Sequence, residues 1–265
     1  MAISPGKRLL EMIPSNNQYE RIWLLAKTDF KLKYYDTFLG FIWTILNPLF
    51  RLAIFYYIFT YIFDKQIPNY ALHIFSGLIL WMFFQESTKK GLSLLKTKRY
   101  LYENIEFSKL DLYTSSVLSS LMILIINILV YFVVSMFFHI PVNGNLLFVP
   151  LQIITLCILV YGIILILSII NIYMKDINQI WDMILLAWFW INPIFYAKTV
   201  IFDTFPILKY INPLAGIIIN TREGILYGNP PDWGLFVYDL GYSLVVLAIG
   251  LILFRLYFHK AAEKL

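Results

Sequence analysis

Charged residues are scarce in this sequence of 265 residues, since Asp, Glu, Lys and Arg make up 14% of it. In soluble domains, roughly a quarter of the residues are charged. Hydrophobic residues make up 60%, and the mean hydropathy is +0.72. This balance excludes an ordinary soluble domain and predicts an integral membrane protein with no room for a second, soluble domain. The single cysteine, Cys157, lies in an apolar run, which excludes an intrachain disulfide and a thiolate metal site.

The motifs of an ATPase or an enzyme are also missing. The only Gly-Lys pair, Gly6-Lys7, has no glycine five positions earlier, so the sequence contains no phosphate-binding P-loop. The three histidines show no metal-ligand spacing: His73, His139 and His259. Asp182 and Asp239 fall near the ends of apolar runs, where we expect solvated helix caps; functional intramembrane acids are the alternative. Residues 1–10 lack the apolar core of a cleavable signal peptide.

Long apolar runs are what the sequence has instead. The run from Leu39 to Phe63 has 25 residues, enough for a helix to cross a bilayer core of roughly 30 Å. We expect Asn47-Pro48 to break and kink it, and Arg51 puts a charge near its middle. Upstream, residues 19–35 combine apolar residues at helical spacing with basic residues. This pattern predicts an amphipathic helix in the cytoplasmic interface; a surface helix on a soluble tail is the alternative.

Five further apolar runs bring the prediction to six transmembrane helices. The six cover residues 39–63, 72–88, 112–138, 146–173, 180–196 and 233–258. Residues 199–228 are apolar too, but prolines cut them into pieces too short to cross. We therefore expect an external re-entrant helical hairpin between spans five and six, with an irregular loop as the alternative. The predicted fold class is an all-α integral membrane protein, one transmembrane domain over residues 1–265.

The distribution of Lys and Arg predicts the orientation. They gather in the N-terminal segment, in the connector 89–111 and in the C-terminal tail, and the opposite side carries few. The positive-inside rule therefore predicts a multi-pass protein of the cytoplasmic membrane with both termini in the cytoplasm.

Several motifs, taken in order, carry a family resemblance. They are Lys27–Tyr34 followed by Gly40–Leu49, Lys175-Asp176-Ile177, Asn192–Tyr196, Asn212-Pro213-Leu214 with Arg222, and the tail Phe258–Leu265. Together they resemble the membrane subunit of a type-2 ATP-binding-cassette exporter of the polysaccharide and polyol-phosphate export family. The chain departs from that family at Ser108, where proline is frequent, and at Arg51, where the residue is usually apolar.

The resemblance implies a transport function and a set of partners. It implies a homodimeric permease that works with two copies of a separate nucleotide-binding ATPase. That ATPase would bind ATP and Mg²⁺, so this chain itself would bind no cofactor and have no enzymatic activity. The cargo would be a lipid-linked glycan of the O-antigen or teichoic-acid type, and nucleic acid is not among the implied partners. An exporter of a lipid or drug, a membrane-embedded glycosyl- or acyltransferase, and a channel are the alternatives.

Two groups of residues are predicted to act at the cytoplasmic side. The connector 89–111 is the only long cytoplasmic loop, and it mixes charge with apolar residues that suit a docking partner. The predicted coupling residues are Leu101, Tyr102, Ile105 and Phe107; a solvated charged loop is the alternative. The predicted lipid-access residues are Lys27, Lys31 and Lys33, whose charges suit anionic headgroups.

The substrate path is predicted from aromatic residues and one arginine. Aromatic residues make up 18% of the chain and cluster at the outer ends of spans one and five. The candidates for contact with sugar are Tyr57, Tyr61, Trp190 and Tyr196; an interfacial anchoring belt is the alternative. Arg51 is predicted to face protein or water and to bind a lipid-linked phosphate with its bidentate guanidinium. The alternative is that it bonds backbone carbonyls or an acid on another span.

Overall fold

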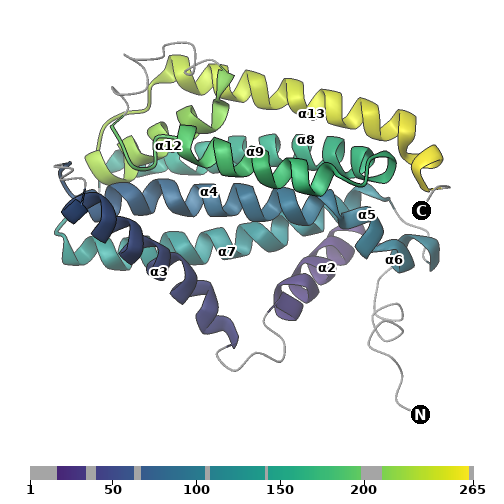
Figure 1. Cartoon of the computed structure of the whole chain (residues 1–265), viewed down its shortest axis with the longest axis horizontal. Coiled ribbons are helices and arrows are strands. Elements are labelled where there is room, and N and C mark those ends of the chain that lie inside the picture. The colour runs from purple at the N-terminus through teal and green to yellow at the C-terminus, as the bar shows by residue number, and fades with distance from the viewer. Residues whose placement is uncertain are drawn as a thin grey trace.

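The computed structural model describes residues 17–33, 40–62, 67–104, 108–140, 143–197 and 211–262, and within these ranges it contains helices and no strand. Figure 1 shows long helices lying side by side in a bundle. The main elements are α2 (Gln18–Lys33), α3 (Trp43–Tyr57), α4 (Tyr70–Leu92), α5 (Leu94–Thr97), α6 (Arg99–Asn104), α7 (Leu110–Phe137), α8 (Val149–Tyr173), α9 (Ile177–Ile191), α12 (Pro213–Arg222) and α13 (Trp233–Ala262). Short 3-10 helices cover residues 40–42 and 144–148, and π-helical turns cover residues 58–62 and 223–227.

Four helical stretches in the described part of the chain are long and apolar enough to cross a membrane. They are Gly40–Tyr61, Leu110–Phe137, Gly144–Tyr173 and Trp233–Phe258. The prediction of an all-helical, multi-pass membrane protein is therefore confirmed. The two other predicted spans correspond to α9, an apolar helix of 15 residues, and to α4, which has 23.

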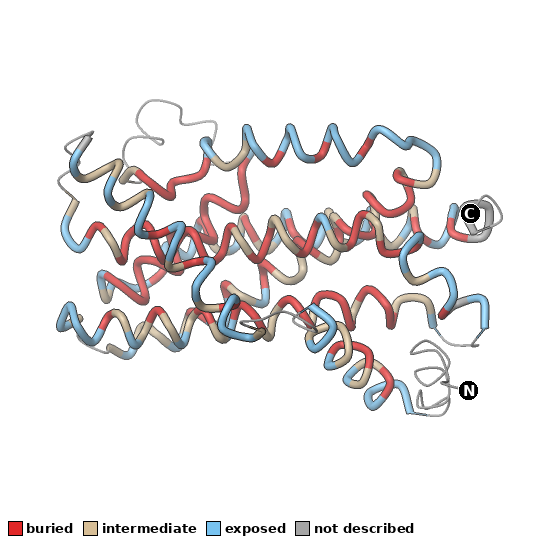
Figure 2. The backbone as a smooth tube through the Cα atoms, turned by 60° about the horizontal axis from the view of Figure 1, so that its bottom comes forward, coloured by how far each residue is buried: buried red, intermediate tan, exposed pale blue. Residues whose placement is uncertain are grey.

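Helix α4 occupies the centre of the bundle. It packs against α3, α7, α8, α9 and α12, and its residues from Leu72 to Trp81 are all buried. Helices α4 and α12 are mostly buried, whereas α9 and α13 alternate between buried and exposed positions. Figure 2 shows the buried positions concentrated inside the bundle. Because protein surrounds α4, it can carry polar residues such as Ser76 and Thr88 that a lipid-facing helix would not tolerate.

Small residues bring α8 and α13 close together. A Cβ atom added to Gly162 would lie 2.6 Å from the backbone nitrogen of Leu247, and one added to Gly250 would lie 2.6 Å from the carbonyl oxygen of Gly162. Close backbone approach through glycine is a common way to join helices within membranes, where apolar burial alone does not favour association. The contact surface between α8 and α13 depends on these two positions.

The expected break at Asn47-Pro48 is wrong, because α3 runs without interruption through Pro48. Pro48 lies in the second turn of the helix, so the one backbone hydrogen bond that it removes is close to the helix start. The irregularity lies at the other end instead, where residues Ile58–Ile62 form a π turn.

The segment between α9 and α13 is described from residue 211 onward. Pro213 opens α12, and a π turn, Glu223–Tyr227, follows it directly. All ten residues of α12 are buried, in contact with α4, α8 and α13. The second half of the predicted re-entrant segment is thus a short buried helix, and residues 198–210 lie outside the described residues.

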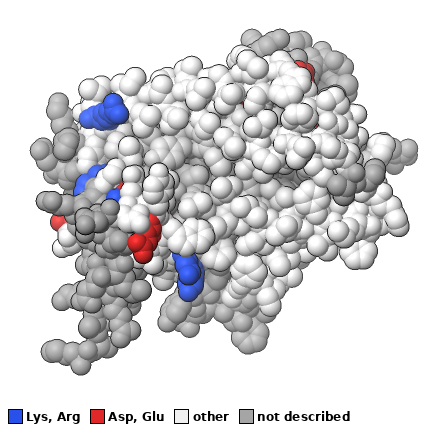
Figure 3. Space-filling view, turned by 180° about the vertical axis from the view of Figure 1, so that it is seen from behind, with Lys and Arg blue, Asp and Glu red and all other residues white. Residues whose placement is uncertain are grey.

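Charged side chains gather at one end of the molecule. Figure 3 shows Lys, Arg, Asp and Glu clustered at the end where α2, α5 and α6 lie, on a face that is otherwise mostly uncharged. Helix α2 lies obliquely under this end, against the first half of α7. On α2, Leu25 and Ala26 face the protein, while Tyr19 and Trp23 are exposed.

Candidate functional site

An ion pair buried in the protein fastens α2 to the start of α7. The guanidinium of Arg21 donates to Asp111 at 2.6 and 2.8 Å, and the Gln18 amide donates to the other carboxylate oxygen at 2.9 Å. The two charged side chains are 7% and 1% exposed. Arg21 is one of the basic residues of the predicted amphipathic helix 19–35, yet its side chain packs on protein. Sequence reasoning missed the pair because its members lie 90 residues apart.

A second carboxylate connects α2 to the connector. Asp29 accepts from Lys98 at 2.5 Å and lies 3.2 Å from Lys90, which is on the last turn of α4. Asp29 is itself 7% exposed at the side chain, so these contacts are shielded from water. Together with Arg21 and Asp111 they join α2, the end of α4 and the short helices α5 and α6 into one unit.

The predicted coupling residues are described only in part. Leu101 lies on α6 and is 0% exposed, so within a single chain it packs in the core rather than at the surface. Tyr102 is on the same helix, and Ile105 and Phe107 lie outside the described residues. The exposed residues of this helix include Tyr100 and the Arg99–Glu103 pair. Tyr100 is thus an exposed aromatic residue of α6, whereas the predicted coupling residue Leu101 is not exposed.

The three lipid-access lysines are all exposed, but they differ in their surroundings. Lys27 and Lys31 face outward, whereas Lys33 forms an ion pair with Glu86 of α4 at 2.5 Å. Lys33 and Glu86 also line an open cleft of about 60 Å³ between α3, α4 and α7. Of the three, only Lys33 is thus part of a structured site.

At the opposite end, Arg222 joins three elements. Its guanidinium donates to the carbonyl of Pro193 at 2.7 Å and to the hydroxyl of Ser76 at 3.1 Å. It is 3% exposed, and a Cβ on Gly77 would lie 2.8 Å from it. Pro193 follows the end of α9, and Ser76 is on α4, so Arg222 holds α12 against both. A charge inside an apolar, proline-rich segment was the signal that could have identified it as a structural centre.

The aromatic residues predicted to line a path fall into two pairs. Tyr57 and Tyr61 have ring centroids 5.1 Å apart and are 62% and 69% exposed. The Tyr196 hydroxyl donates to the carbonyl of Trp190, which is 52% exposed.

Other aromatic residues bring the two span ends into contact. Phe59 stacks on Phe195 at 4.5 Å, and Phe55 meets the same ring at 4.8 Å. The sequence pattern does not separate these packing rings from the exposed ones, because both kinds occur in the same aromatic runs.

Arg51 is exposed on the outer face of α3, and none of the ion pairs or hydrogen bonds found within the described residues involves it.

The interpretation of Asp239 as a solvated cap is wrong. It lies two turns inside α13, is 0% exposed, and neither carboxylate oxygen has a partner in the described part of the chain. It faces α12, since a Cβ on Gly216 would lie 2.1 Å from it. Asp182, in contrast, is 57% exposed and pairs with Lys89.

Comparison with known proteins extends over nearly the whole chain. The family described as ABC-2 type transporter matches residues 20–226. An O-antigen export system permease protein from Klebsiella pneumoniae is 26% identical over 251 residues, which is 93% of this chain and 95% of that protein. One from Myxococcus xanthus is 25% identical, over 83% of this chain and 85% of that protein. A polysialic acid transport protein from Escherichia coli is 26% identical, over 82% and 85%.

The matched region runs from α2 to the π turn after α12, so it includes the unit around Arg21 and Asp111 and the centre around Arg222 at the opposite end. Within the described residues, no group of three or more His, Cys, Asp or Glu could hold a metal ion. The architecture of apolar spans, with charge at one end, is that of a membrane permease whose matched region has no nucleotide-binding domain. The chain belongs to the ABC-2 type transporter family, as a membrane permease subunit.

Proposed function

We propose that this permease exports a lipid-linked polysaccharide across the cytoplasmic membrane. The observation that carries the proposal is the similarity, over at least four fifths of the chain, to O-antigen and polysialic acid export permeases. These relatives differ in cargo, so the proposal covers a class of cell-surface glycan rather than one sugar. The proposed working unit is two copies of this chain with two copies of a separate ATPase that binds ATP and Mg²⁺.

The proposed topology has six spans, with α4 and α9 added to the four long apolar helices. Helix α4 has enough residues to cross, at about 1.5 Å per residue, and protein covers Ser76, Ser87 and Thr88. An even number of spans brings α2 and the last turns of α13 to the same end, as Figure 1 shows. The clustering of charge at that end supports a cytoplasmic assignment.

In this proposal, the two ends of the bundle serve different steps of transport. At the inner end, α2 exposes Lys27 and Lys31 toward the membrane surface, where they attract anionic headgroups of the cargo. The connector lies beside α2, so an ATPase that docks there acts on the same unit. At the outer end, Tyr57, Tyr61 and Trp190 expose flat aromatic faces that suit the apolar faces of sugar rings.

A gene-deletion experiment tests this function. Removing the gene should abolish surface polysaccharide and leave the lipid-linked glycan inside the cell, and the plasmid-borne gene should restore export. The control is the same plasmid in cells whose partner ATPase carries an inactivating substitution, which should not restore it. Normal surface polysaccharide in the deletion strain, together with altered lipid export or drug resistance, would instead establish the alternative of a lipid or drug exporter.

A further inference from the structure

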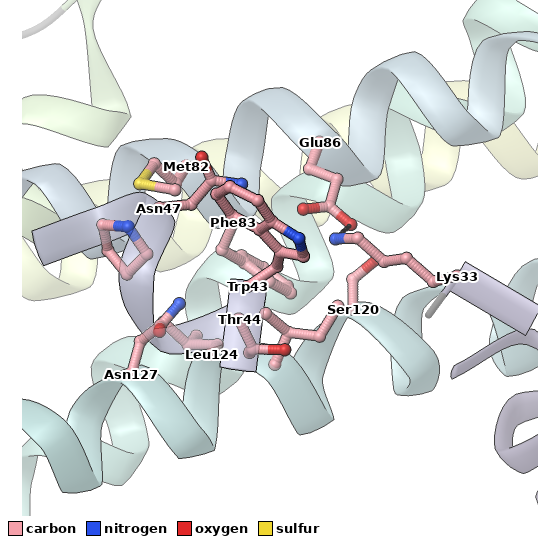
Figure 4. A pocket seen from close by; sticks show the side chains of 12 residues that line it. Lys33, Trp43, Thr44, Asn47, Met82, Phe83, Glu86, Ser120, Leu124 and Asn127 are labelled. Carbon is pink, nitrogen blue, oxygen red and sulfur yellow. Dashed lines mark hydrogen bonds and ion pairs between the residues drawn. The ribbon is translucent and has the colours of Figure 1, made fainter. Parts of the chain in front are cut away.

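The cleft beside Lys33 is enclosed by three helices and reaches into the bundle. Figure 4 shows side chains from α3, α4 and α7 that converge on it, with Lys33 at the end of α2 on one side. The lining combines apolar surface with hydroxyl and amide groups. The residues that the argument uses are Trp43, Thr44, Met82, Phe83, Ser120 and Asn127.

Three polar atoms in this lining lack a partner. The Thr44 hydroxyl, the Ser120 hydroxyl and the Asn127 side-chain oxygen are buried, and none has a hydrogen-bond partner in the described part of the chain. The three residues are 4%, 3% and 3% exposed. Native proteins leave few buried polar groups unpaired, and each such group needs an explanation. Here three of them line one cleft, with Ser120 and Asn127 about two turns apart on the same side of α7.

The charges of the cleft cancel. Lys33 and Glu86 pair with each other, and their side chains are 37% and 38% exposed. The pair therefore offers no net charge to an anionic or a cationic ligand. A strongly anionic group placed here would meet Glu86 as well as Lys33. The unpaired groups are neutral, and they include an amide oxygen that requires a donor. The complementary ligand is therefore net-neutral at this point and offers groups that both donate and accept.

We propose that this cleft binds the hydroxyl-bearing sugar headgroup of a membrane glycolipid. Sugar hydroxyls donate and accept, which matches two hydroxyls and an amide oxygen. The indole of Trp43 lines the same cleft and offers a flat face to a sugar ring. Met82 and Phe83 provide the apolar wall against which the lipid part packs.

This inference deepens the proposed function and rests on it only for the identity of the glycolipid as cargo. A resident glycolipid of the membrane would present the same headgroup chemistry. Binding and export are measured separately below, so that one idea can fail without the other.

The test uses the full-length chain in nanodiscs of dioleoyl phosphatidylcholine that contain a small fraction of monoglucosyl diacylglycerol with the same acyl chains. The variants replace each unpaired group by an apolar residue of similar shape: Thr44→Val, Ser120→Ala and Asn127→Leu. The matched control is Ser115→Ala, because Ser115 is also buried on α7 but donates to the Leu112 carbonyl at 3.0 Å and does not line the cleft. Native mass spectrometry counts the retained lipids, and thermal unfolding measures stability.

We expect the wild type to retain glucosyl lipid over phosphatidylcholine, and each cleft variant to lose about tenfold in affinity for it. The melting temperature of the unliganded variants should be equal to or higher than that of the wild type, because an unpaired polar group has been removed from the interior. Ser115→Ala should leave lipid retention unchanged.

Equal retention of both lipids, unchanged affinity in the variants, or a lowered melting temperature in all three variants would overturn the site. If the variants lose glucosyl lipid yet polysaccharide export persists, the site holds a resident glycolipid. If binding is as expected but the gene deletion leaves export intact, the proposed function fails and the site stands.

Discussion

Arg21 is one of the few charged side chains that this fold buries, at 5% exposure, and its partner Asp111 is 1% exposed. A buried ion pair of this kind gains little over an apolar pair, since both charges lose water. Removing one partner is different, because the other charge then stays buried without compensation. The pair therefore specifies where α2 docks more than it adds stability.

Asp111→Asn should lower the free energy of unfolding by about 3–5 kcal/mol, because it removes the carboxylate that accepts two hydrogen bonds from the buried Arg21 guanidinium. The double variant Arg21→Met, Asp111→Leu should lose less than the single variant. Denaturation in mixed micelles, arranged as a double-mutant cycle, measures both. A loss below about 1 kcal/mol for Asp111→Asn would show that water reaches the pair.

Arg51 supports a second prediction, on the cargo rather than on the fold. Because the described residues do not bury it, Arg51→Met should leave assembly with the ATPase unchanged and should abolish export if the guanidinium binds a lipid-linked phosphate. Arg51→Lys keeps the positive charge but loses the bidentate guanidinium, so we expect partial export. Export assays and co-purification distinguish the outcomes. Full export by the Met variant would remove Arg51 from the substrate path.

Among elements, helix α4 shows what an apolar run can and cannot reveal. The run predicts a helix over 72–88, and α4 covers 70–92, so it continues through Lys89 and Lys90. The lysines mark the end of the apolar stretch, but the backbone stays helical, since lysine is a good helix former and its charge is favourable in the last turn. In the structure Asp29 and Asp182 pair with them. These partners come from α2 and α9, and a single apolar run holds no information about them.

Helix α6 allows the docking hypothesis to be tested by two neighbouring residues. Tyr100 is 39% exposed and Leu101 is 0% exposed. Tyr100→Asp should weaken ATPase binding at least about tenfold with an unchanged melting temperature, since an exposed aromatic anchor is lost. Leu101→Ala should lower the melting temperature first, because it leaves a cavity. Binding is measured by surface plasmon resonance with the purified ATPase. Intact binding by Tyr100→Asp would move the docking surface elsewhere in the connector.

For the whole molecule, the sequence predicts an all-helical, multi-pass membrane protein, and four of the six predicted spans coincide with long apolar helices in the described part of the chain. It does not predict how the segments pack. Asp239 illustrates the limit: a position near the start of an apolar run indicates a cap, whereas its burial depends on α12 lying against α13. The cleft was missed for the same reason, because Thr44 and Ser120 meet only after α3 and α7 pack together.

The outer aromatics give a prediction at this scale. Alanine at Tyr57 and at Trp190 should each reduce glycan export while leaving stability and ATPase assembly unchanged, because both side chains are exposed. Phe195→Ala is the matched control. It removes a buried ring that Phe55 and Phe59 contact, so the melting temperature should fall. Export is measured as surface polysaccharide. Undiminished export in both exposed variants would assign these rings to the interfacial belt.

The close contact of α8 with α13 makes these two helices a tightly packed pair. Gly162 and Gly250 let the two backbones touch, so any relative sliding of these helices would drive atoms into one another. The stretch Gly40–Tyr61, which contains α3, has a buried share of 17%, against 56% for Gly144–Tyr173 in α8 and 22% for Trp233–Phe258 in α13. Packed interfaces resist deformation, and motion follows the elements with the fewest contacts. We therefore expect α8 and α13 to move as one body during transport, with α3 free to shift relative to them.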